Sequence, residues 1–134
     1  MNARGGRAGG AGAGGVPEPV LRARVYLSRV AEPPAPGLAV LVAEVGPVRA
    51  AELVRRGEVP ERVAVETSAR RAADRVDVDL AAASAGGVRL LTPEDPDWPA
   101  ASLGDLAACG VPDLAPPVAL WVLLAASSCC SATE

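Results

Sequence analysis

Apolar residues recur at helical spacing from residue 20 onward, and each run ends at Gly or Pro. The first run spans residues 20–30 and stops before two prolines. The second spans residues 38–45 and ends at Gly46, and the third spans residues 48–56 and ends at Gly57. Because Gly and Pro terminate helices, the pattern predicts one helix followed by two short helices that a tight Gly-Pro turn joins.

A fourth run has the longest apolar face. Its apolar positions fall on one side of a helix, and they are Val65, Ala69, Ala72, Ala73, Val76, Leu80 and Ala83. The spacing predicts one unbroken helix that ends at Gly86-Gly87. Arg70–Asp74 and Arg75–Asp79 would then form ion pairs four residues apart on the exposed side of that helix.

The apolar period changes after Gly87. Residues 88–92 and residues 118–122 are short and rich in branched apolar side chains, and each predicts a strand. Between them, an acidic, proline-rich segment predicts a loop, and Asp97 is expected to cap a short helix that runs through Leu106. The chain is therefore expected to be mainly α-helical with a small α/β portion.

The same patterns divide the chain into four segments. Residues 1–17 are Gly-rich and are expected to be a disordered leader, and residues 18–86 are expected to form a helical domain. Residues 87–122 would form a strand–loop–helix–strand unit, followed by an unrelated tail at 123–134. Val118–Leu124 is expected to lack sheet partners, so that residues 18–86 melt cooperatively while the later residues exchange their amides quickly.

Composition excludes several classes of site. The chain has no His and three Cys, which removes the imidazole base and the usual zinc ligands. We find no paired carboxylates and no Gly-rich phosphate loop, so we expect no catalysis, cofactor or metal. The longest strongly apolar run has nine residues and no secretory signal is visible, which predicts a cytoplasmic protein.

Charge argues against an extended electrostatic surface for nucleic acid. The net charge is −3, and residues 18–85 hold ten Arg and ten acidic residues. Residues 86–134 hold one Arg against six acidic residues, a net charge of −5. Any contact with nucleic acid would therefore have to be local.

Two motifs in the second half of the chain are specific enough to suggest a family resemblance. The first is Thr92-Pro-Glu-Asp-Pro-Asp-Trp-Pro99, and the second is Pro116-Pro-Val-Ala-Leu-Trp-Val122. With the helical hairpin before them, they resemble the DNA-processing protein A (DprA, or Smf) family in its actinobacterial form, over about residues 20–122. The resemblance implies a sterile-alpha-motif-like helical domain and the start of a Rossmann-like domain. It also implies single-stranded DNA and the recombinase RecA as partners in natural transformation.

The sequence departs from this family after Val122. Family members continue with Arg-Gly and a Gly-Ser/Ala-Arg turn that contacts DNA phosphates, whereas here the chain continues with Leu-Leu-Ala-Ala-Ser-Ser-Cys-Cys. We interpret the sequence as truncated before the DNA-contacting part of the Rossmann-like domain. None of the family's DNA-contacting residues is therefore assigned, and we expect DNA binding to be weak or absent.

The turn between the second and third helices is the candidate nucleic-acid site. Helix–hairpin–helix modules present backbone N–H groups to a phosphate, and here the donors would be Gly46, Val48 and Arg49. Glu44 stands where a second Gly is common and would repel phosphate, so a purely structural turn is the favoured interpretation.

Other conspicuous residues favour structural interpretations. Arg55-Arg56 and Arg70-Arg71 are expected to form an ion-paired, solvated face, and Trp98 and Trp121 are expected to be core residues. The acidic residues of the loop, Glu94, Asp95 and Asp97, suit turn chemistry better than a metal site. Cys129-Cys130 in the tail lacks a nearby positive charge that would activate a thiol.

Two alternatives to DNA binding stay open. The helical residues 18–86 suit a protein-interaction module, which predicts that they capture a protein partner. A non-functional product of a disrupted gene is the other alternative, and a matching Arg-Gly strand in another reading frame downstream would establish it.

Overall fold

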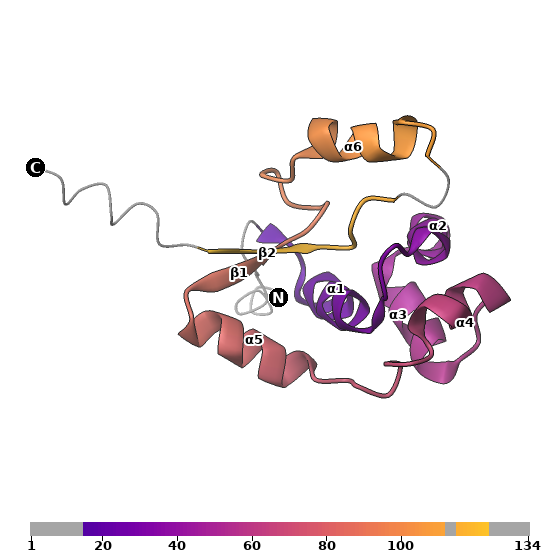
Figure 1. The fold of residues 1–134 in the computed structure, drawn as a ribbon. Coiled ribbons are helices and arrows are strands. Elements are labelled where there is room, and N and C mark those ends of the chain that lie inside the picture. Colours follow the sequence, from indigo (N-terminus) through magenta and orange to yellow (C-terminus); the bar gives the residue numbers. More distant parts are fainter. Residues whose placement is uncertain (1–14, 112–114, 124–134) are drawn as a thin grey trace, which may run out of the picture.

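The computed structural model describes residues 15–111 and 115–123, which form a mainly α-helical structure with a small antiparallel sheet (Figure 1). The elements in chain order are α1 (Glu18–Val30), α2 (Pro36–Val45), α3 (Pro47–Arg56), α4 (Glu61–Thr67), α5 (Val76–Ala85), β1 (Val88–Leu91), α6 (Ala100–Ala108) and β2 (Leu120–Leu123). The predicted fold class is confirmed.

The first three helices lie where the apolar pattern places them. Gly46 separates α2 from α3 with φ 86°, and Gly57 ends α3 in the left-handed region with φ 75°. Both angles suit a residue that lacks Cβ. The helical hairpin predicted from the Gly-Pro turn is therefore confirmed.

The prediction of one long fourth helix that ends at Gly86-Gly87 was wrong. The chain forms two helices instead, and residues 68–75 between them are turns and irregular backbone. Most of the predicted apolar face was Ala, whose methyl groups bury little area, and Val65 on that face is 71% exposed. The buried hydroxyl of Tyr26 donates to the carbonyl of Arg71 at 2.7 Å, which a continuous helix would have used internally.

The ion pairs predicted on that helix are replaced by pairs with other elements. Asp74 accepts from Arg55 of α3 at 2.8 Å, and Asp79 accepts from Arg29 of α1 at 2.7 and 2.6 Å. The break in the helix therefore frees these carboxylates to tie α5 and its leading segment to α1 and α3.

The two strands pair with each other. β1 and β2 are antiparallel, with Val88 opposite Leu123 and Leu90 opposite Trp121. The expectation that residues 118–124 lack a sheet partner was therefore wrong for Leu120–Leu123. An antiparallel pair is not the parallel β–α–β unit that builds a Rossmann sheet, so this pairing does not support the Rossmann-like start. Residues 1–14, 112–114 and 124–134, with the predicted leader and most of the tail, lie outside the described residues.

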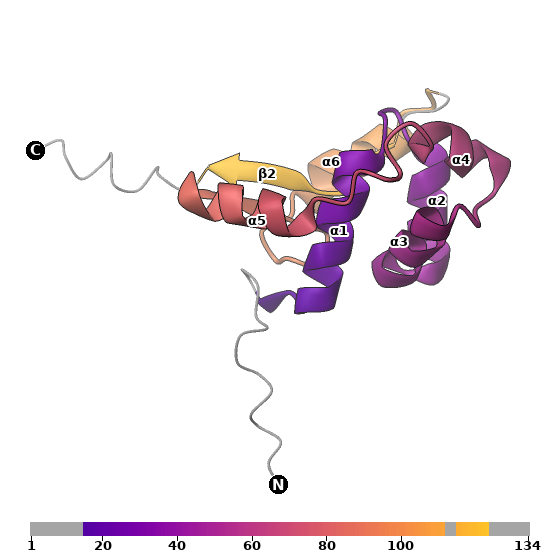
Figure 2. The same cartoon turned by 90° about the horizontal axis from the view of Figure 1, so that it is seen from below.

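The hydrophobic core surrounds α1. This helix lies between the group of α2, α3 and α4 on one side and α5 with the sheet on the other, as two perpendicular views show (Figures 1 and 2). Its buried residues Val25, Leu27 and Val30 belong to one cluster with Leu38 of α2 and Val54 of α3. The cluster also contains Leu90 of β1 and Ala119, so the core continues across the predicted boundary at residues 86 and 87.

Arg24 connects α1 to the end of the chain. Its side chain is 8% exposed. Its Nε and Nη2 atoms donate to the Glu94 carboxylate at 2.8 and 2.6 Å, and Nη1 donates to the Val118 carbonyl at 3.0 Å. Because a buried guanidinium requires partners, these bonds fix the loop after β1 and the entry to β2 against the helix.

The acidic loop is held by a second arginine. Asp95 is buried and accepts from Arg89 of β1 at 2.7 Å, and its other oxygen accepts from the backbone N–H of Asp97 at 2.8 Å. Asp97 does not cap α6, whose N-cap position is Pro99. Its side chain accepts from Arg89 at 3.1 Å instead, so the acidic side chains shape the loop rather than start the helix.

These contacts lower the pKa of two loop carboxyls. Partial burial opposes ionisation of Glu94, but the hydrogen bonds and charge of Arg24 outweigh it, and the net effect lowers the pKa of Glu94. The hydrogen bond from Arg89 lowers the pKa of Asp95, and the backbone donor at Asp97 adds to this effect. On α5, the hydrogen bond from Arg29 lowers the pKa of Asp79.

Arg24→Ala tests the connection between α1 and the loop. The variant leaves the partly buried Glu94 carboxylate and the Val118 carbonyl without their donor, so the free energy of unfolding should fall by about 3 kcal/mol in urea denaturation. Arg49→Ala, which removes an exposed arginine from an ion pair within α3, should cost less than about 0.5 kcal/mol. Equal losses in the two variants would contradict the role given to Arg24.

Acid should destabilise the fold over a defined range. The pKa values of Asp79, Glu94 and Asp95 are lower in the folded state than in the unfolded state, so protonation favours unfolding. Stability from these groups should be complete above about pH 5 and decline as the pH falls through about 4 and below. Urea denaturation at a series of pH values measures the slope, and stability that stays constant down to pH ~3 would contradict the ion pairs.

Candidate nucleic-acid interface

The turn between α2 and α3 has the geometry of a helix start. The backbone N–H of Gly46 donates to the Val42 carbonyl at 2.8 Å, and its own carbonyl accepts from Ala50 at 3.0 Å. Pro47 follows and has no N–H to satisfy. Gly46 therefore ends one helix and begins the next within a single residue.

Val48 and Arg49 lie in the first turn of α3. Their N–H groups have no acceptor within that helix, because acceptors four residues earlier fall outside it. Val48 is 38% exposed and Arg49 is also exposed. The structure thus brings Gly46, Val48 and Arg49 together at one accessible helix N-terminus, but the Gly46 N–H is already bonded to the Val42 carbonyl and is not an open donor. Contact of Val48 and Arg49 with phosphate stays a prediction.

The charges around the turn oppose an anion. The Nη1 atom of Arg49 lies 3.0 Å from a carboxylate oxygen of Glu52 on the same helix. Glu44 is exposed in the last turn of α2. A phosphate at this turn would have to compete with one carboxylate and approach another.

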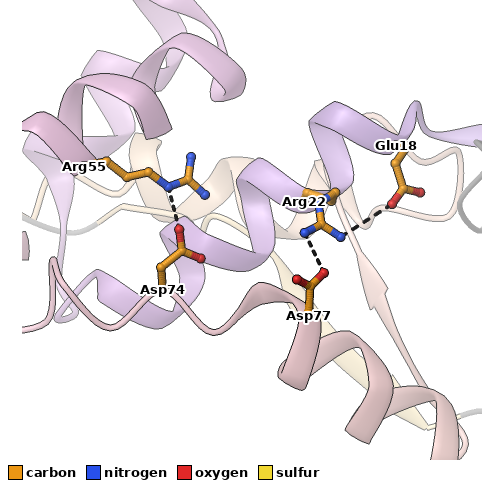
Figure 3. A network of polar contacts seen from close by, with 5 residues as sticks. All are labelled: Glu18, Arg22, Arg55, Asp74 and Asp77. Atoms are coloured by element: carbon orange, nitrogen blue, oxygen red, sulfur yellow. Dashed lines mark hydrogen bonds and ion pairs between the residues drawn. The ribbon is translucent and has the colours of Figure 1, made fainter.

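Three of the four arginines in the predicted strip, Arg55, Arg56 and Arg70, lie beside a carboxylate, and the fourth, Arg71, is exposed. Arg55 donates to Asp74, and Arg22 lies between Glu18 of its own helix and Asp77 of α5, at 3.8 and 2.7 Å (Figure 3). Arg56 and Arg70 lie 3.7 Å from Glu58 and Glu32. Arg55 also lies over the ring of Tyr26, 4.2 Å from its centroid. The short ion pairs of Arg22 and Arg55 therefore join separate elements, whereas the carboxylates of Glu58 and Glu32 lie beyond hydrogen-bond distance of their arginines.

Trp121 is exposed, so the prediction that it belongs to the core was wrong. It was expected in the core because it lies within an apolar run, yet 41% of it is exposed, whereas Trp98 is half-buried. The burial of β2 alternates along the strand, and Trp121 is on the more exposed side with Leu123. The sequence shows no matching alternation, because Leu120–Leu123 are all apolar, so periodicity could not have placed Trp121.

A groove lies beside Trp121. It has a volume of about 470 Å³ and separates α1, α5 and the sheet. We call it the Trp121 groove, and its lining residues are Ser28, Arg29, Arg70, Asp79, Ala82, Ala83, Val88 and Trp121. Its lining includes an exposed aromatic ring, two arginines, one aspartate and several small side chains.

The described part of the chain gives no indication of a metal site or a membrane span. Among residues 15–111 and 115–123, no group of three or more metal-ligating side chains is close enough to hold an ion. No helix in these ranges combines the length and apolarity needed to cross a bilayer.

Comparison with known proteins gives one clear relationship. The chain is 46% identical over 109 residues to proteins named DNA processing protein DprA from two strains of Mycobacterium tuberculosis, CDC 1551 / Oshkosh and ATCC 25618 / H37Rv. The alignment covers 79% of this chain and 28% of each relative, so the chain spans less than a third of their length. No family model and no solved structure matches it.

This identity extends well beyond the two motifs that suggested the resemblance, and its level over so many residues indicates common descent. Over about four fifths of its length, therefore, this chain is related to the DNA-processing protein A (DprA) family.

Proposed function

We propose that this chain acts in the handling of single-stranded DNA during DNA uptake, in the manner implied for the DprA family, where the bound strand is passed to RecA. The observation that supports the proposal is the 46% identity over 109 residues to proteins named for DNA processing. Because the chain spans 28% of those relatives, the proposed activity of these residues is a contribution to strand binding.

The ion pairs of the structure set the strength of that contribution. The arginines Arg22, Arg29 and Arg55 bind carboxylates at 2.6–2.8 Å, and the net charge of the chain is −3. A phosphate must therefore exchange with a carboxylate before it can pair with one of these arginines. Such binding releases few counterions, so it is weak and depends little on salt.

Fluorescence anisotropy with labelled oligo-dT tests the proposal. We expect a Kd weaker than about 1 μM at physiological salt, within the range of roughly 1–100 μM typical of non-specific binding. The logarithm of the affinity should fall with the logarithm of salt with a slope of about −1 to −2, because few phosphates are neutralised.

Duplex DNA of the same length is the matched control and should bind less tightly. No detectable binding of oligo-dT at low salt would contradict a role in strand binding. A sub-micromolar Kd at physiological salt would contradict the weak, ion-paired interface.

A second candidate function is a protein-interaction module, and exposed valines favour it. Val40 of α2 is 57% exposed and lies beside a groove of about 340 Å³ between α2 and α4, and Val65 of α4 is 71% exposed. Apolar side chains at such positions are typical of docking surfaces.

Affinity capture with the full chain tests this second function. A partner that binds this surface should be lost in Val40→Asp and retained in Val78→Asp, which places the same charge at an exposed valine of α5. A partner that both variants retain would exclude the α2–α4 surface.

A further inference from the structure

We infer that the Trp121 groove is a subsite for one nucleotide of a single strand, in which the base stacks on Trp121 and an adjoining phosphate pairs with Arg70. The inference rests on the proposed function and gives it a location. The chemistry of the site is that of a planar heterocycle attached to a phosphate, which a single strand and a free nucleotide share.

The strand register presents Trp121 to the groove. Trp121 lies opposite Leu90, and Val88 lies opposite Leu123, so these four side chains share one face of the sheet. Leu90 at one end of this face is 4% exposed and belongs to the core, whereas Trp121 is 41% exposed. Trp121 therefore lies at the edge of the core, next to buried Leu90 and among the residues that line the groove.

Short apolar side chains line part of the groove. Ala82 and Ala83 of α5 and Val88 of β1 line it with short apolar side chains. The volume of about 470 Å³ falls within the roughly 300–1,000 Å³ of small-molecule sites. A base that enters would exchange water for contacts with the indole and these methyl groups, as bases do on the aromatic platforms of single-strand-binding proteins.

The two arginines of the groove differ in how firmly they are held. Arg29 makes two hydrogen bonds to Asp79, at 2.7 and 2.6 Å, which neutralise that carboxylate inside the groove. Arg70 lies 3.7 Å from Glu32, beyond hydrogen-bond distance, and its side chain is 56% exposed. Arg70 can thus turn to a phosphate at little cost, and a guanidinium can pair with two phosphate oxygens at once.

The test compares groove variants with matched controls in the full chain. Trp121→Ala and Arg70→Gln alter the groove, whereas Trp98→Phe and Arg56→Gln make comparable changes outside it. Arg56, like Arg70, is 56% exposed and lies 3.7 Å from a carboxylate. The ligands are oligo-dT of about a dozen nucleotides, an abasic strand of the same length and charge, and dTMP. Anisotropy gives the Kd for the labelled strands, and tryptophan fluorescence in the Trp98→Phe background reports on Trp121 for all three ligands.

We expect Trp121→Ala to weaken oligo-dT binding by about 5- to 150-fold and Trp121→Phe to restore most of it, because stacking needs an aromatic ring. Binding of the abasic strand should not change in Trp121→Ala. Arg70→Gln should weaken both strands and make the salt slope shallower by about one. Oligo-dT should quench the fluorescence of Trp121, while Trp98→Phe and Arg56→Gln bind as the wild type does.

Other results would overturn the inference. Unchanged oligo-dT binding in both groove variants excludes the groove, and an equal loss in Arg56→Gln and Arg70→Gln shows a general effect of charge instead of a contact at the groove. Quenching by dTMP with an affinity equal to that of oligo-dT identifies a free-nucleotide site instead of a strand subsite. If Trp121→Ala fails to fold, the binding loss in Arg70→Gln and the quenching of Trp121 in the Trp98→Phe variant still test the groove. A wild type that binds no strand contradicts the proposed function itself.

Discussion

A buried guanidinium is the constraint on which the arrangement of this chain depends. Arg24 lies in the middle of α1, and its donors must be satisfied away from water. They are satisfied by Glu94 and by the carbonyl of Val118, which follow it by 70 and 94 residues. The helix, the acidic loop and the second strand therefore come together around one side chain, and the groove beside Trp121 exists because β2 is held in that position.

Several arginines of this molecule form ion pairs that join separate parts of the chain. Arg22 and Arg29 join α1 to α5, and Arg55 joins α3 to the segment before α5. An anion that approaches these helices meets arginines whose carboxylate partners are already in place. Under the proposed function, a nucleic acid would therefore contact an aromatic ring that can stack and an arginine that is loosely paired, so Trp121 and Arg70 are more informative than the net charge.

The sequence predicted the features whose causes are local. Gly46 and Gly57 end helices through their own backbone angles, so the hairpin could be placed from the chain alone. The contacts that fold the rest are between distant residues. Glu66 accepts hydrogen bonds from the N–H groups of Gly37 and Leu38 and so caps α2 from α4, with no local signature. The unwinding before α5 depends on the acceptor that Tyr26 requires, which periodicity does not reveal.

The way α5 is attached has a consequence for how this structure opens. Val76 is the one buried residue of α5 and Leu80 is partly buried, and the ion pairs of Arg22 with Asp77 and of Arg29 with Asp79 also join the helix to α1. Surface ion pairs weaken as ionic strength rises, whereas apolar contacts strengthen with many salts. Concentrated salt would therefore loosen α5 while tightening the helices around α1, and the wall that α5 contributes to the groove would be the first part of the molecule to respond.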